Sequence, residues 1–362
     1  MTTAAPGPLQ PARGRRPSWP RRAVLASVGG TAVAMLALSA CGSTTASSSA
    51  GSPAGAGSSG SASGNGQTIT VAYVPSAAYE PLLVAVQDGY FTQQHIDVRL
   101  TKVSSDASAI SQVAANKVQV ALSGFTAGMF NAIHQGSGLK VVGSMAQEAP
   151  GAPANALVGA VSPGKVTSLA GLKGEKIAVD GGAGSTGAYL VAKALAPSHV
   201  SLSQVTLVNL SPAQMAGALK AGTVAAAYMT APYLGSAVSA GEAKVLAAES
   251  ASTGTTGVIY GSAFAGTPGA QQFFDAVAEA AGQLQGTAPS FPANLTPVAQ
   301  ATGQSLAALE KEPQYDFSPD LEPSTALLND MQSVFLSSKE LNYTTLVPTS
   351  GYVNGTFAVS LG

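Results

Sequence analysis

The sequence is poor in cysteine, histidine and charged side chains. Its 362 residues include one cysteine, three histidines and 10% charged residues, with a formal net charge of −1. A lone cysteine cannot form an internal disulfide. A net charge of −1 provides no positively charged surface of the kind that binds a nucleic acid. The histidines His95, His134 and His199 are not paired at metal-ligand spacing. These absences exclude a disulfide scaffold and argue against nucleic-acid binding.

Motifs of common enzymes are also missing from the chain after residue 67. We find no G-x-S-x-G elbow, no P-loop and no cysteine nucleophile there. The glycine-rich segment 181–187 superficially resembles a phosphate loop, but it lacks the P-loop lysine. We therefore expect no catalytic residue, no cofactor and no metal ion, and we predict that the protein is not an enzyme.

The N-terminal segment is first basic and then apolar. Residues 1–22 contain five arginines and no acid, and an apolar run covers residues 23–40. This pattern is typical of an export signal. The run ends in the sequence LSACG at residues 38–42, which resembles the bacterial lipobox, where the cysteine is acylated and the preceding peptide is removed. We predict a signal peptide at residues 1–40 and lipidation at Cys41, with an uncleaved anchor helix as the alternative.

The export route and the tether follow from the neighbouring residues. Arg21 and Arg22 lie in a segment that resembles a twin-arginine motif, so both the Sec and the twin-arginine routes stay open. Residues 43–67 are almost wholly Ser, Gly, Ala, Thr and Pro, a composition typical of a flexible tether. Residues 41–67 would therefore be a lipidated linker that holds the folded part at the extracytoplasmic face of a bacterial cell membrane.

Two segments of the remaining chain repeat one pattern of strand, loop, helix, strand, helix and strand. Short β-rich runs separated by helical patterns indicate βαβ units in a parallel sheet. The sequence therefore predicts an α/β fold with two lobes, each a mostly parallel sheet flanked by helices, and a ligand cleft between the lobes. The predicted strands are residues 69–74, 96–100 and 118–124 in the first segment, and 176–180, 205–210 and 224–230 in the second.

Two apolar runs would carry the chain between the lobes. Residues 156–161 and 257–262 show little alternation, as buried strands do. We assign residues 68–156 and 258–362 to lobe 1 and residues 157–257 to lobe 2. Hinge closure would act through the two crossing segments.

Polar side chains follow the first and third strands of both repeats. Open α/β sheets bind ligands beyond the carboxyl ends of their strands. Each of these four loops precedes a predicted helix, whose free N–H groups would point into the cleft. Helix capping alone would also explain Ser76, Ser185 and Thr186. The predicted ligand-binding residues are Ser76, Tyr79, Ser123, Phe125, Thr126, Gly184, Ser185, Thr186, Thr230 and Tyr233.

Several motifs resemble those of a known family. They are residues 71–76 (VAYVPS), 81–91 (PLLVAVQDGYF), 96–98, 136–142 (GSGLKVV), 168–179 (SLAGLKGEKIAV), 218–222 (ALKAG) and 231–233 (APY). They resemble the substrate-binding proteins of ABC importers for nitrate, sulfonates, taurine and thiamine pyrimidine precursors. The chain departs from the family at Ala225, where an acid is usual.

The resemblance implies a type II periplasmic-binding fold whose lobes close on a solute. The partners it implies are a membrane permease and an ATPase, and we expect a monomer. A tethered sensor that signals to a partner kinase is a second possibility. A third is a pyrimidine synthase on the same fold, although the cysteine-rich motif of that enzyme is absent here.

The loops give a first hypothesis about the solute. None of the four cleft loops carries Arg, Lys or His, so an anion would be held by hydroxyls and backbone amides. We place a sulfonate-, taurine- or nitrate-like solute first and a thiamine-pyrimidine-like heterocycle second. Glu80 and Glu148 would instead suit a cationic or amine group, but a carboxylate in a closed cleft is costly unless it is paired.

Overall fold

The computed structural model describes residues 66–151, 153–161, 166–250 and 253–361. The predicted signal peptide, the predicted lipidation site Cys41 and residues 41–65 of the predicted linker lie outside these ranges. Within them, no helix has the length and apolar character needed to cross a bilayer.

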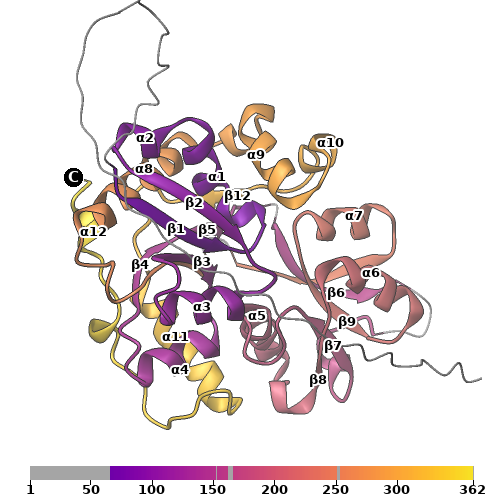
Figure 1. Cartoon of the computed structure of the whole chain (residues 1–362). Coiled ribbons are helices and arrows are strands. Elements are labelled where there is room, and N and C mark those ends of the chain that lie inside the picture. Colours follow the sequence, from indigo (N-terminus) through magenta and orange to yellow (C-terminus); the bar gives the residue numbers. More distant parts are fainter. Residues whose placement is uncertain (1–65, 152, 162–165, 251–252, 362) are drawn as a thin grey trace, which may run out of the picture. The chain divides into compact units, whose positions relative to one another are not determined.

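The first sheet has five strands in the order β2-β1-β3-β11-β4 (Figure 1). Strand β1 pairs in parallel with β2 and β3, whereas β11 runs antiparallel to β3 and β4. We call this sheet with its helices the first lobe. The strands are β1 (Thr68–Tyr73), β2 (Asp97–Lys102), β3 (Val120–Gly124), β4 (Lys140–Ser144) and β11 (Thr256–Tyr260).

The second sheet has five strands in the order β10-β6-β9-β7-β8, and we call it with its helices the second lobe. Strand β7 pairs in parallel with β8 and β9, and β6 runs antiparallel to β9 and β10. Strands β5 and β12 form a separate antiparallel pair. The strands are β5 (Ala146–Glu148), β6 (Asn155–Ala160), β7 (Lys176–Val179), β8 (Thr206–Asn209), β9 (Ala226–Thr230), β10 (Ala243–Ala248) and β12 (Tyr315–Phe317).

The two sheets have the same topology when β1, β2 and β3 are matched with β7, β8 and β9. In each sheet, the strand beside this parallel trio is the one that arrives from the other lobe. The chain enters the second lobe with β6 and returns to the first with β11. The predicted fold class, two similar α/β lobes with mostly parallel sheets, is therefore confirmed.

The helices begin where the sequence supplies capping residues. Side chains of Ser105, Thr126, Ser185 and Ser324 accept backbone N–H groups in the first turns of α3, α4, α5 and α11. The helices are α1 (Glu80–Gln87), α2 (Tyr90–Gln93), α3 (Asp106–Ala114), α4 (Ala127–His134), α5 (Thr186–Leu195), α6 (Pro212–Ala221), α7 (Tyr233–Ser239), α8 (Pro268–Gln283), α9 (Pro292–Thr302), α10 (Leu306–Leu309), α11 (Thr325–Ser337) and α12 (Thr356–Val359).

One apolar cluster continues from the first sheet into the second. It includes Ile259 of β11 and Ile177 of β7, together with Leu328, Met331 and Phe335 of α11. Helix α11 contacts both α4 and α5. Each fully buried side chain of this size contributes about 1.5–3 kcal/mol. Helix α11 therefore ties the two lobes together.

Glu80 is a buried acid at the start of α1. It is 1% exposed, and its Oε1 has no hydrogen-bond partner among the described residues. Burial raises the pKa of Glu80 to about 9. Because the folded state favours the neutral form, this carboxyl stabilises the fold fully below its unfolded pKa of about 4.3, and the contribution is lost as the pH rises through 9.

The variant Glu80→Gln tests this. Between pH 5 and 9 the native protein should lose up to about 1.4 kcal/mol per pH unit through Glu80, and Glu80→Gln should lack this contribution. Chemical denaturation at several pH values measures the difference. The control is the replacement of the exposed Glu175 by Gln, which should leave the pH dependence of the free energy of unfolding unchanged. If Glu80→Gln and the native protein show the same pH dependence, Glu80 is not the source of this loss of stability.

Candidate ligand-binding cavity between the lobes

A cavity of about 220 Å³ lies where the loops after β1, β7 and β9 meet. The first lobe contributes Ser76 and Tyr79 after β1, and Asp106 at the start of α3. The second lobe contributes Asp180 directly after β7, and Thr186 in the first turn of α5. The carboxyl ends of parallel strands thus surround the cavity from both lobes, as expected for an open α/β sheet.

Half of the predicted ligand-binding residues line this cavity. They are Ser76, Tyr79, Thr186, Thr230 and Tyr233. The side chain of Ser76 also caps the turn Ala77–Tyr79 by accepting the N–H of Ala78 at 3.2 Å. Ser76 therefore caps a turn and faces the cavity at the same time.

The other five predicted residues lie outside the cavity lining. Phe125 is in the core, and the buried Ser123 donates its hydroxyl to Asp106 Oδ1 at 3.1 Å. Thr126 and Ser185 cap α4 and α5. The carbonyl of Gly184 accepts the N–H of Ala127 at 2.9 Å. The Gly184 carbonyl thereby joins the two lobes, and the role of all five residues in ligand binding stays a prediction.

The two lobes meet at Gly124. A Cβ at this position would lie 2.7 Å from Thr186 Oγ1 and 2.8 Å from Asp106 Oδ2. Contacts this short are essentially never seen at real Cβ atoms, so a larger residue would displace the side chain of Thr186 or of Asp106. Glycine therefore permits the close approach.

Two carboxylates that the sequence analysis missed line the cavity, Asp106 and Asp180. Oδ1 of Asp106 accepts the N–H of Gly124 at 3.0 Å and the hydroxyl of Ser123. Burial raises the pKa of Asp106 despite these hydrogen bonds. Burial and the negative charge of Asp106 raise the pKa of Asp180. The two acids are therefore close enough to repel each other.

A second pair of acids lies at the crossing segments. Glu148 accepts the side-chain amide of Asn155, whose carbonyl oxygen accepts the Tyr315 hydroxyl at 2.9 Å. Tyr228 donates its hydroxyl to Glu249 at 2.5 Å. Burial raises the pKa of Glu148 to about 7, and burial with the nearby Glu148 charge raises that of Glu249 to about 8. Glu148 contacts Asn155 here and does not line the cavity.

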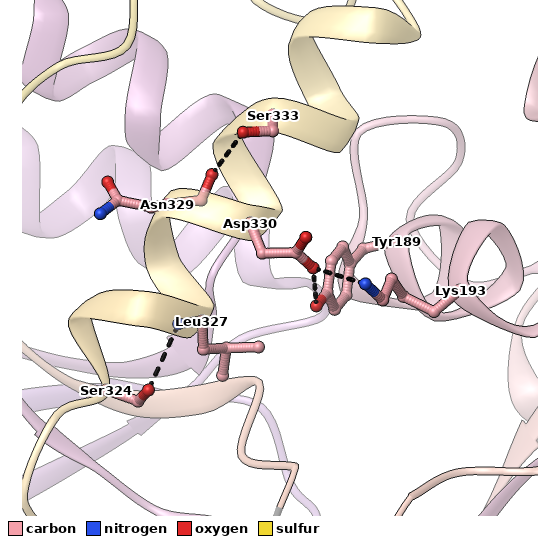
Figure 2. A network of polar contacts seen from close by, with 7 residues as sticks. All are labelled: Tyr189, Lys193, Ser324, Leu327, Asn329, Asp330 and Ser333. Atoms are coloured by element: carbon pink, nitrogen blue, oxygen red, sulfur yellow. Dashed lines mark hydrogen bonds and ion pairs between the residues drawn. The ribbon is translucent and has the colours of Figure 1, made fainter. Parts of the chain in front are cut away.

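A polar network joins α5 to α11 (Figure 2). Asp330 of α11 accepts the Tyr189 hydroxyl at 2.6 Å and the Lys193 ammonium at 3.0 Å. Burial would raise the pKa of Asp330, but these two donors outweigh it and lower the pKa. Tyr189 and Lys193 also line a second cavity of about 300 Å³, which shares Leu190, Tyr228 and Thr253 with the first.

Solved structures share this two-lobed periplasmic-binding fold. The alkanesulfonate-binding protein SsuA from Xanthomonas axonopodis pv. citri, bound to MOPS, matches with a TM-score of 0.63 and 20% identity, over 80% of this chain and 98% of that one. The aliphatic sulphonate-binding protein SsuA from Escherichia coli has a TM-score of 0.63 and 18% identity, and the match covers 80% of this chain and 92% of that one. The nitrate-binding protein NrtA from Synechocystis PCC 6803 has a TM-score of 0.67 and 12% identity, and the match covers 82% of this chain and 89% of that one.

The family follows from the sequence itself. Residues 76–261 match the model of the NMT1/THI5-like family, and the chain therefore belongs to this family. The family resemblance inferred from the motifs is confirmed. No curated protein sequence matches the chain significantly.

The Asp330 network should hold the lobes together measurably. Asp330→Asn removes the ion pair with Lys193 and weakens the hydrogen bond from Tyr189, so we expect a loss of about 0.5–1.5 kcal/mol. A melting curve should shift down by about 1–4 °C. The matched control is Glu242→Gln, which breaks the exposed pair with Lys220 in the second lobe. Equal shifts in both variants would contradict a linking role for Asp330.

Proposed function

We propose that this protein is the extracytoplasmic solute-binding lipoprotein of an ABC importer. It captures a small solute in the cavity between its lobes and delivers it to a membrane permease with its ATPase. The observation that carries the proposal is the cavity itself, because both lobes line it at the carboxyl ends of their strands. Three structural relatives with this fold bear names of sulfonate- or nitrate-binding proteins.

The place of action is part of the proposal. Lipidation at Cys41 and the Ser- and Gly-rich linker would anchor a monomer at the outer face of the cell membrane. A linker of this composition is flexible, so it holds the folded part near the membrane without fixing its orientation. The folded part can therefore contact a permease in the same membrane. The protein would act by binding, not by catalysis.

The cavity limits the size of the solute. Pockets for drug-sized ligands measure roughly 300–1,000 Å³, and this one has about 220 Å³. Ser76, Thr186 and Thr230 line it and carry hydroxyls. Thr256 also lines it, and the Thr256 Oγ1 has no partner among the described residues. The site therefore suits a small, polar solute.

The charge of the lining separates the two solute classes. A sulfonate- or nitrate-like anion could use the hydroxyls, but it would meet Asp106 and Asp180. A heterocycle or amine with hydrogen-bond donors suits these carboxylates better. The lining thus favours the donor-rich solute that the sequence analysis placed second.

A thermal-shift screen tests solute binding. Alkanesulfonates, taurine, nitrate, thiamine pyrimidine and small amines would be added singly to the purified protein. A solute at a hundred times its dissociation constant adds about 2.7 kcal/mol, which is a shift of several degrees for this chain length. At least one class should raise the melting temperature. If no member of any class does so, the importer proposal loses its basis.

Thr186→Val tests whether the solute contacts the second lobe. Valine keeps the shape of this lining residue but removes its hydroxyl, so the dissociation constant of the solute found in the screen should rise about five- to tenfold. Titration calorimetry measures this. The control Thr92→Val changes an exposed threonine in α2. An unchanged constant for Thr186→Val would remove Thr186 from the site.

A further inference from the structure

The charged groups that line the cavity are all negative. Asp106 faces it from the first lobe and Asp180 from the second. No lysine, arginine or histidine is found among the described lining residues. Glu148 and Glu249 lie behind Asn155 and Tyr228 and add further acidic groups nearby.

These carboxylates have capacity for a further partner. Oδ1 of Asp106 accepts two hydrogen bonds, whereas its Oδ2 accepts none from the described residues. The three ion pairs of the described chain lie elsewhere, so neither Asp106 nor Asp180 has a cationic partner there. Two like charges around a small cavity repel each other. A positive charge between them would offset this repulsion.

Aromatic side chains form part of the remaining wall. Four tyrosines line the cavity: Tyr79, Tyr228, Tyr233 and Tyr315. The faces of aromatic rings attract cations, and such rings are used to recognise ammonium groups. They also supply apolar surface for the carbon atoms of an amine.

Thr256 gives an independent observation. It lines the cavity, and its buried Oγ1 has no hydrogen-bond partner among the described residues. Buried hydroxyls normally have a partner. A polar solute in the cavity would supply one.

We infer that the cavity takes a small cationic solute, a protonated amine or a quaternary ammonium compound, with Asp106 and Asp180 as its counter-charges and the tyrosines as its aromatic wall. This inference rests on the proposed solute-binding function and names the class of solute. It separates this chain from a binder of anions such as sulfonate or nitrate.

Calorimetric titration with matched probes tests the inference. The probes are choline, its neutral isostere dimethylbutanol, ethanolamine, taurine and ethanesulfonate. We expect choline or ethanolamine to bind, dimethylbutanol to bind at least tenfold more weakly than choline, and ethanesulfonate to be the weakest. Tighter binding of ethanesulfonate or taurine than of either cation would overturn the inference and leave the solute-binding proposal intact. Binding of none of the five probes would also overturn it, while the broader screen decides the proposed function separately.

Two substitutions test whether Asp106 and Asp180 are the counter-charges of the bound cation. Asp180→Asn changes an exposed side chain and should leave folding intact, and Asp106→Asn keeps an oxygen that can accept from Ser123 and Gly124. Each should raise the dissociation constant of the cation at least tenfold. Asp88→Asn, an exposed residue at the end of α1, is the control. Affinity unchanged in both cavity variants, with melting curves like that of the native protein, would overturn the assignment.

Discussion

The close approach of the two lobes at Gly124 is the constraint on which the site depends. A Cβ at this residue would lie 2.7 Å from Thr186 Oγ1 and 2.8 Å from Asp106 Oδ2, and the Ala127 N–H donates to the Gly184 carbonyl beside it. This contact brings the first turns of α4 and α5 together, and the loops at the carboxyl ends of β1, β7 and β9 surround the cavity. The network around Asp330 and the shared apolar cluster hold the same arrangement from the side of α11.

The electrostatics of the site follow from this geometry. Asp106 is fixed by the backbone of Gly124, and Asp180 stands at the end of β7, so the lobe contact brings two acids to one small space. Their mutual repulsion is part of why the Asp180 pKa is raised. This repulsion favours binding of a solute of opposite charge, because such a solute reduces the repulsion between Asp106 and Asp180 when it binds.

The sequence predicted the fold well because the same order of strands and helices occurs twice along the chain. The pattern of residues 69–124 recurs at 176–230, and the two sheets have matching strand orders. The loops after the first and third strands were also identified, and five of the ten predicted residues line the cavity. The sequence could not separate a capping serine from a cavity residue, since Ser185 and Thr186 are neighbours with different surroundings.

The two carboxylates were missed for specific reasons. The predicted strand at residues 176–180 includes Asp180, but β7 ends at Val179 and Asp180 opens the loop. Asp106 follows the second strand of its repeat, whereas the predicted site loops follow only the first and third strands. Its place in the cavity depends on the Ser123 and Gly124 hydrogen bonds, which join segments far apart in the sequence. An acid directly after any strand of either repeat would have been the signal.

The central claim is that one small solute contacts both lobes at once. Amide hydrogen exchange with and without a saturating solute tests this most directly, because it locates protection along the chain. The account predicts simultaneous slowing in residues 74–79 of the first lobe and in residues 180–187 and 230–233 of the second. Protection confined to one lobe, or located away from these loops, would contradict it.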